Sequence, residues 1–318
     1  MKDYSQDNLF QLIKTQLAQV PMPDEPHRLL YGRGGGFPGL RGINIDRFPP
    51  LTLITLYEDF SQEEVVSLGQ IVEKIYPESP LMIQDRSKRP ATLRLEKGEI
   101  PKEFTIVENG LEFFIHPERG QNPGFFPDMR EGRLLIRKMV TQMSSTTEKI
   151  HVLNLFSYTC SLSVAAVAAG ASKVINIDMN RRSLDIGKRN HRLNHKAIPG
   201  GYQTQAAFLS HDIFKSFGRL KKEGPYNLII ADPPPNQKGS FLLAKDYPRL
   251  IRRLPEMLKP GGEILLANNL PGWSWEDFES MVKENLPPLK AIKRLDPPKD
   301  YAPISPGRGL KIISISLS

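Results

Sequence analysis

The spacing of apolar residues divides the chain into two parts with different patterns. The first part opens with apolar residues at the interval of one helical face, which predicts a helix over residues 1–20 that ends in the Pro-rich linker 21–26. Beyond the linker, residues 62–75 have helical spacing, and short strands are expected at 51–57, 81–83, 92–95, 104–107 and 111–115. Asn109-Gly110, between the last two strands, predicts a two-residue hairpin turn. These patterns predict a small α+β domain over residues 27–120.

From residue 121 onward, apolar strands and helices alternate regularly. The strands are expected at 151–156, 173–177, 203–209, 226–231, 263–267 and 310–317. The helices are expected at 162–170, 181–194, 244–258 and 275–284. Alternation at this spacing predicts an α/β domain over residues 121–318, with a doubly wound, mostly parallel sheet and helices on both faces.

The composition is that of an ordinary globular protein. Hydrophobic residues make up 39% of the chain and charged residues 25%, which excludes collagen-like, coiled-coil and wholly disordered classes. No stretch is apolar enough over roughly 20 residues to span a bilayer, and the polar N-terminus shows no secretory signal. Cys160 is the single cysteine, so neither an intrachain disulfide nor a zinc-ligand set is expected. We therefore expect a cytoplasmic protein without a metal site.

The charge is unevenly divided between the two parts. Residues 1–120 hold 14 Lys and Arg against 18 Asp and Glu, whereas residues 121–318 hold 29 against 17. A basic half beside an acidic half indicates a polyanionic partner, with nucleic acid favoured over a merely solvated surface. The basic residues of 181–194 are accordingly either a solvated helix face or a track for phosphates.

Polar residues follow four of the predicted strands, at the edge where ligands bind in open α/β sheets. The small-residue turn 157–161 opens a helix and offers backbone N–H groups to an anion. Asp178 is placed to accept bonds from ribose hydroxyls, Asp212 from an adenine amino group, and Asp232-Pro233-Pro234 follows the fourth strand. Each feature alone is an ordinary helix cap or rigid turn, but the ordered set predicts a site for a nucleoside with an anionic tail.

Residues 121–318 resemble the class I S-adenosylmethionine-dependent methyltransferases, and more narrowly those that modify large-subunit ribosomal RNA. The matching segments are Gly124-Phe125-Phe126-Pro127-Asp128-Met129-Arg130, Leu153-Asn154-Leu155-Phe156-Ser157-Tyr158-Thr159, Asp178-Met179-Asn180, Arg189-Asn190 with Leu193-Asn194, Asp232-Pro233-Pro234, and Asn268-Asn269 with Gly272-Trp273. The last pair is most similar to the N7-guanine methyltransferase half of the bifunctional rRNA guanine enzyme. Residues 28–48 are similar to the small central domain of the same family.

The resemblance implies a Rossmann-like sheet whose last strand is antiparallel, with S-adenosylmethionine as cofactor. Asp178 would bind the ribose, Asp212 the adenine edge, and the turn 159–161 the methionyl carboxylate. The implied cofactor contacts are Phe126, Asp128, Arg130, Phe156, Ser157, Tyr158, Thr159, Cys160, Ser161, Asp178, Met179, Asp212, Ile213 and Asp232. The implied catalytic residues are Asp232, Pro233 and Asn268. The implied partner is RNA, ribosomal RNA above all, while the oligomeric state stays open and includes a homodimer.

The sequence departs from the family pattern at three places. Cys160 stands where relatives usually have glycine, and we expect the turn to have adapted to it with a negative φ. Pro235 follows the Asp-Pro-Pro motif, where relatives usually have an aromatic residue nearby. The strand bearing Asn268 lacks the cysteine that attacks cytosine in the 5-methylcytosine enzymes, so guanine is favoured over cytosine C5. A protein or small-molecule methyltransferase, and an RNA-binding relative without catalysis, are the alternatives.

Overall fold

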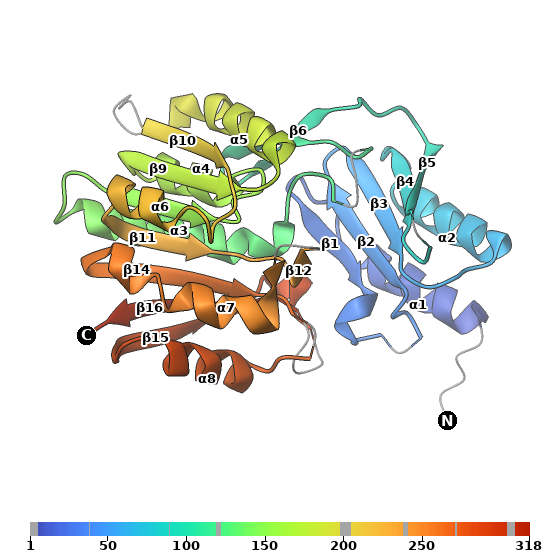
Figure 1. Cartoon of the computed structure of the whole chain (residues 1–318). Helices are drawn as coiled ribbons and strands as arrows, with labels where there is room; N and C mark the ends of the chain where they lie inside the picture. Colours follow the sequence, from blue (N-terminus) through green and yellow to red (C-terminus); the bar gives the residue numbers. More distant parts are fainter. Residues whose placement is uncertain are drawn as a thin grey trace. The chain divides into compact units, whose positions relative to one another are not determined.

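The chain forms two compact units, shown in the computed structural model of Figure 1. The structure describes residues 6–37, 39–88, 90–118, 122–197, 205–237, 241–270, 272–303 and 309–318. The first unit comprises Met1–Pro127 with Lys299–Pro306, and the second comprises Asp128–Pro298 with Gly307–Ser318. The polypeptide therefore returns to the first unit late in the sequence.

The first unit is built on a five-stranded sheet in the order β1-β2-β3-β4-β5. Its strands are β1 (His27–Tyr31), β2 (Ile43–Phe48), β3 (Leu51–Leu56), β4 (Leu81–Asp85) and β5 (Thr92–Lys97). Helices α1 (Gln6–Ala18) and α2 (Gln62–Ile75) share one apolar cluster with this sheet. Strands β6 (Phe104–Glu108) and β7 (Leu111–Ile115) form a hairpin, and the positive φ angles of Asn109 and Gly110, 51° and 75°, confirm the predicted turn.

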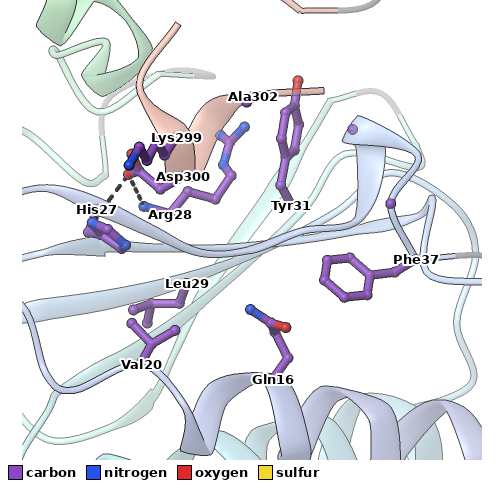
Figure 2. Close-up of a pocket in the computed structure, with 12 residues that line it drawn as sticks. Gln16, Val20, His27, Arg28, Leu29, Tyr31, Phe37, Lys299, Asp300 and Ala302 are labelled. Carbon is purple, nitrogen blue, oxygen red and sulfur yellow. Dashed lines mark hydrogen bonds and ion pairs between the residues drawn. The ribbon is translucent and has the colours of Figure 1, made fainter. Parts of the chain in front are cut away.

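The edge strand β1 is capped by the returning segment rather than left open. Asp300 lies in the short helix η6 (Lys299–Tyr301), and its Oδ2 accepts a hydrogen bond of 3.0 Å from the backbone N–H of Arg28. Asp300 and Arg28 also line a cavity of about 360 Å³, and Figure 2 shows their contact among the lining residues. The Arg28 guanidinium lies between the rings of Tyr31 and Tyr301 and pairs with Asp46, so its charge is compensated within the unit. These contacts occupy an edge that otherwise invites strand addition.

The second unit contains a seven-stranded sheet in the order β10-β9-β8-β11-β14-β16-β15. Its strands are β8 (His151–Leu155), β9 (Lys173–Asp178), β10 (Gln205–Ser210), β11 (Tyr226–Ala231), β14 (Leu258–Asn268), β15 (Leu289–Leu295) and β16 (Lys311–Leu317). Strands β10, β9, β8, β11 and β14 run parallel, and β16 is antiparallel to both its neighbours. This confirms the doubly wound, Rossmann-like sheet with an antiparallel last strand.

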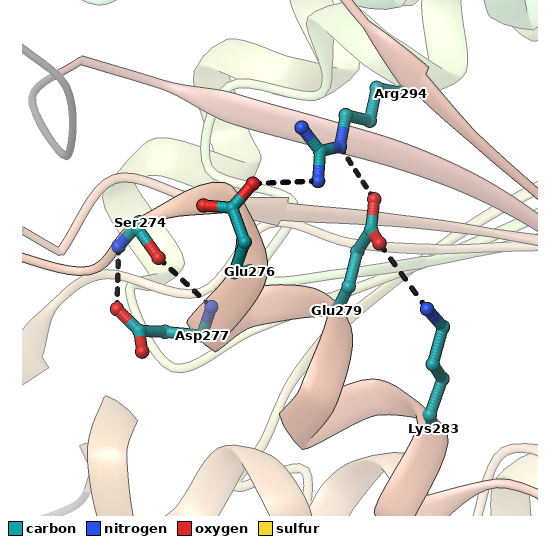
Figure 3. A network of polar contacts seen from close by, with 6 residues as sticks. All are labelled: Ser274, Glu276, Asp277, Glu279, Lys283 and Arg294. Carbon is teal, nitrogen blue, oxygen red and sulfur yellow. Dashed lines mark hydrogen bonds and ion pairs between the residues drawn. The ribbon is translucent and has the colours of Figure 1, made fainter.

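The helices of the second unit fall into two groups. Helices α3 (Arg130–Ser144), α4 (Ser161–Ala168) and α5 (Arg181–Leu193) contact one another in sequence. Helices α6 (Phe217–Glu223), α7 (Leu243–Ile251) and α8 (Trp275–Asn285) share the main apolar cluster of the sheet. Helix α8 starts with a capping box between Ser274 and Asp277, and its Glu276 and Glu279 pair with Arg294 of β15 (Figure 3). None of the helices in the described part has the length and apolarity needed to cross a membrane.

The expected helix over residues 244–258 was wrong at its C-terminal end. Helix α7 stops at Ile251, and Leu258 already begins β14. The apolar spacing continues because Leu254 and Met257 are buried, but Pro255 has no N–H to donate and a 3-10 turn replaces the α-helix. The pattern also missed α3, whose buried face includes Gly132 and Arg133 and so lacks a continuous apolar stripe. Strands β1, β2 and β15 and helix α6 were not predicted either.

Candidate active site

The loop between β8 and α4 has an unusual backbone. Phe156, Tyr158 and Cys160 are all non-glycine residues in the left-handed region, with φ angles of 56°, 46° and 65°. Such conformations cost free energy and persist only where surrounding contacts impose them. Helix α4 follows with no side-chain cap at Cys160, so the N–H groups of its first turn are available to an anion.

Asp178, at the end of β9, holds this loop in place. Its Oδ2 accepts a hydrogen bond of 2.9 Å from the Tyr158 N–H, and its Oδ1 accepts one of 2.7 Å from the Asn180 N–H. Asn190 of α5 adds a bond of 2.9 Å from its Nδ2 to the Thr159 carbonyl. A carboxylate offers about four acceptor positions, so Asp178 retains capacity for further donors. Burial raises the pKa of Asp178, while the two backbone N–H groups lower it.

Cys160 does not have the backbone expected for it. A negative φ was predicted, and the angle is 65°. The side chain is fully buried, and its Sγ packs against Gly187 of α5, where an added Cβ would lie only 2.4 Å from the sulfur. Burial raises the pKa of the thiol well above its usual range. The Cys160 side chain therefore fills the space that a side chain at position 187 would occupy.

We expect Gly187→Ala to destabilise the protein by about 1–3 kcal/mol, because its methyl group overlaps Cys160 in a packed interior. The double variant Cys160→Gly/Gly187→Ala should recover most of this loss, since the glycine removes both atoms of the clash and the strain of φ 65°. Urea unfolding of the two single variants and the double variant measures the coupling. Additive losses would show that the two positions do not pack against each other.

Asp232 lies directly after β11, the strand beside β8 in the sheet. Burial raises its pKa to about 7, with a further rise from the charge of Asp128 and an opposing effect from Arg133. Arg133 is 2% exposed, and its Nη1 donates a hydrogen bond of 3.4 Å to Ser161 Oγ at the start of α4. The sequence predicted Arg130 as a cofactor contact, and this residue is half-buried. Arg133 was not predicted, because nothing in the sequence distinguishes a buried arginine from an exposed one.

Two buried donors lie opposite each other, one at the end of β14 and one at the start of β16. Asn268 is fully buried; its Oδ1 accepts a bond of 2.8 Å from the Leu270 N–H, and its Nδ2 has no hydrogen-bond partner in the part of the chain that the structure describes. Lys311 lies opposite Asn268 on the neighbouring strand β16 and is 1% exposed. Its Nζ donates a hydrogen bond of 3.4 Å to the Gly309 carbonyl. Burial lowers the pKa of Lys311. The sequence signal for Lys311 was a lysine inside an apolar strand.

The remaining predicted residues lie at several places in the fold. Asp212 closes a turn by accepting a bond of 2.8 Å from the Phe214 N–H, and Ile213 beside it is buried. Met179, next to Asp178, is 46% exposed. Pro233 is buried after Asp232, whereas Phe126 belongs to the first unit and is 37% exposed. The parallel strands thus bring Asp178, Asp212 and Asp232 to one edge of the second sheet.

The donor and acceptor set at this edge fits S-adenosylmethionine. The cofactor carries two ribose hydroxyls, an adenine amino group and a carboxylate. Asp178 and Asp212 are acceptors suited to the first two groups, and the uncapped N-terminus of α4 is suited to the third.

The chain matches the family model of S-adenosylmethionine-dependent methyltransferases over residues 27–316. Ribosomal RNA large subunit methyltransferase I from Enterobacter sp. (strain 638) is 27% identical over 272 residues, which cover 82% of this chain and 65% of that protein. The protein of the same name from Yersinia pseudotuberculosis is 30% identical over 257 residues, covering 77% and 61%. The chain therefore spans a little less than two thirds of these relatives.

Solved structures agree with the family assignment. A methyltransferase complexed with SAH (S-adenosylhomocysteine) is 25% identical, with a TM-score of 0.79 over 98% of this chain and 80% of that one. An S-adenosylmethionine-dependent methyltransferase from Streptococcus mutans is 24% identical, with a TM-score of 0.82 over 99% and 82%. The second likeness concerns the fold alone.

Proposed function

Because the chain belongs to the family of S-adenosylmethionine-dependent methyltransferases, we propose that it transfers a methyl group from this cofactor to a base of ribosomal RNA. The observation that carries the proposal is the edge of the second sheet, where Asp178 holds the 156–161 loop and Asp232 follows the adjoining strand. The names of the curated relatives and the basic charge of residues 121–318 support RNA as the substrate.

In this proposal, two acidic residues and one helix end hold the cofactor. Asp178 accepts hydrogen bonds from the ribose hydroxyls, using positions that the Tyr158 and Asn180 N–H groups leave free. Asp212 faces the adenine amino group, and the first turn of α4 binds the carboxylate. Arg133, next to Ser161, adds positive charge near the same helix end. S-adenosylmethionine, when bound, supplies an electrophilic methyl group at this edge.

Asp232 and the carbonyl of Pro233 orient the target base in this scheme. With a pKa of about 7, the Asp232 carboxyl is present in both protonation states near neutral pH. The ionised form accepts a hydrogen bond from an N–H group of the base and so fixes the nucleophilic nitrogen in line with the methyl donor. A ring nitrogen with a lone pair needs no proton removed before it attacks. Asn268 contributes a donor without a partner in the described part of the chain.

The cysteine content favours a nitrogen atom over cytosine C5 as the methyl acceptor. Attack on cytosine requires a cysteine nucleophile at the active edge. The single cysteine, Cys160, is fully buried against α5, and burial raises its pKa so that the thiolate is scarce. Among the bases that offer a nitrogen, guanine is favoured by the resemblance of Asn268-Asn269 with Gly272-Trp273 to the N7-guanine methyltransferase.

Labelled S-adenosylmethionine distinguishes this function from its alternatives. The protein is incubated with deproteinised ribosomal RNA, with ribosomal proteins and with a small-molecule extract in separate reactions. Label in the RNA alone is the expected result. Label in the proteins or small molecules alone would assign a different substrate class, and cofactor binding without label in any fraction would indicate a relative without catalysis.

A further inference from the structure

We propose that the α7 ridge, defined as Lys215, Lys245, Arg249 and Arg253, is the surface on which the RNA backbone docks. This inference rests on the proposed function, because it names where an RNA substrate is held. The ridge combines side chains of α7, of the residues after it and of the segment before α6. The ridge consists of positively charged side chains, which bind phosphates without reading the base sequence. Its partner is therefore the phosphate backbone.

Three of the four cations of the ridge are not neutralised by acidic side chains of the described residues, whereas Arg253 is paired with Glu256. Segments 214–223 and 245–256 together hold eight Lys and Arg against three Asp and Glu. Lys215, Lys245 and Arg249 are exposed, and none of them makes an ion pair with an acidic side chain of the described residues. By contrast, Arg294 and Lys283 near α8 are paired with glutamates (Figure 3). The uncompensated charge attracts a polyanion.

Two of the arginines are held in place by aromatic rings. The Arg249 guanidinium lies 4.8 Å from the centroid of Phe214, and that of Arg253 lies 4.8 Å from the centroid of Phe217. The two rings meet edge to face at 5.9 Å. The guanidinium of Arg253 is also paired with Glu256, at 2.8 Å from its Nε. That of Arg249 is stacked without such a pair among the described residues, so its N–H edge is available for a phosphate and it loses little freedom on binding. The ridge is therefore preorganised rather than merely charged.

Ring contacts connect the ridge to the candidate active site. Phe214, beneath Arg249, stacks on Phe241 at 6.3 Å, and Phe241 meets Phe156 at 4.9 Å. Phe156 opens the 156–161 loop, and Phe214 hydrogen-bonds to Asp212. RNA bound at Arg249 is consequently adjacent to the edge that holds Asp178 and Asp212. A strand lying on the ridge can present a base there.

Helix α5 provides a control surface of similar charge. Arg181, Arg182 and Arg192 are exposed on it, and Lys188 pairs with Asp185 at 3.0 Å. Helix α5 contacts α4 and contributes no residue to the apolar cluster that contains α6, α7 and α8. Removing two arginines from α5 changes the net charge by the same amount as removing two cations from the ridge. The comparison therefore separates the position of the charge from its total amount.

The test compares Lys245→Ala/Arg249→Ala with Arg181→Ala/Arg182→Ala in binding to deproteinised large-subunit ribosomal RNA. The ridge variant is expected to bind roughly 10-fold more weakly at physiological salt, and its slope of log affinity against log salt should fall by about 1 to 2. The α5 variant should change affinity less than about twofold. Arg249→Lys keeps the charge but weakens the ring stack, so it should retain the slope and lose part of the affinity.

Equal losses in the two double variants would overturn the proposal, because they would indicate a diffuse field. A larger loss in the α5 variant would place the RNA on the other surface and also overturn it. S-adenosylmethionine affinity should be the same in all variants, which shows that the fold is intact. A wild type that binds no RNA at any salt concentration would instead reject the proposed function.

Discussion

Asp232→Ala is expected to slow single-turnover methyl transfer to ribosomal RNA by roughly 100- to 1,000-fold, while S-adenosylmethionine affinity changes less than about threefold. The reason is the proposed position of the carboxylate, which orients the base rather than the adenosine. Single-turnover rates and calorimetric cofactor affinity, measured on both proteins, separate the two roles. Equal losses in rate and affinity would mean that Asp232 only helps to hold the cofactor.

Asp232→Asn tests the role of the Asp232 charge, because the amide does not titrate and the pH dependence of its rate can be compared with that of the wild type. The wild-type rate should rise between pH 6 and pH 8, because the ionised carboxylate is the active form and its pKa is about 7. The amide variant should show no such rise. A group whose pKa is raised on folding also lowers stability as pH increases from about 4 to 7. The variant should therefore be more stable than wild type at pH 8, although less active.

Asp178→Ala is expected to weaken S-adenosylmethionine binding by about 1.5–3 kcal/mol, roughly 10- to 150-fold in Kd. The loss has two sources: the proposed bonds to two ribose hydroxyls, and the bonds that fix the loop at Tyr158 and Asn180. Calorimetric titration with S-adenosylmethionine measures it. Asp185→Ala is the matched control, because it removes an exposed carboxylate of the same charge from α5. An unchanged Kd for Asp178→Ala would remove the ribose assignment.

Sequence reasoning succeeded where a local pattern determines the structure. Asp178 could be placed at a strand end because the β-branched residues Val174, Ile175 and Ile177 before it predict a strand, and the parallel sheet then brings it to the 156–161 loop. The Asn109-Gly110 turn was predictable for the same reason, since its residue types select its backbone.

Features that depend on distant contacts were not predictable. The positive φ of Cys160 requires space at Gly187, which is 27 positions away in sequence and adjacent only in the fold. Arg133 has the residue type of a surface position, and only the packing of α3 reveals that it is buried. The end of α7 was misplaced because residues of a 3-10 turn continued its apolar spacing.

Nucleoside analysis of methylated RNA is the most direct test of the account. Deproteinised large-subunit ribosomal RNA is incubated with the protein and labelled S-adenosylmethionine, digested to nucleosides and separated by mass. The predicted result is label in a methylguanosine, with the signal lost in Asp232→Ala. Label in 5-methylcytidine would contradict the account, because Cys160, the single cysteine of the chain, is buried against α5 and cannot act as the nucleophile.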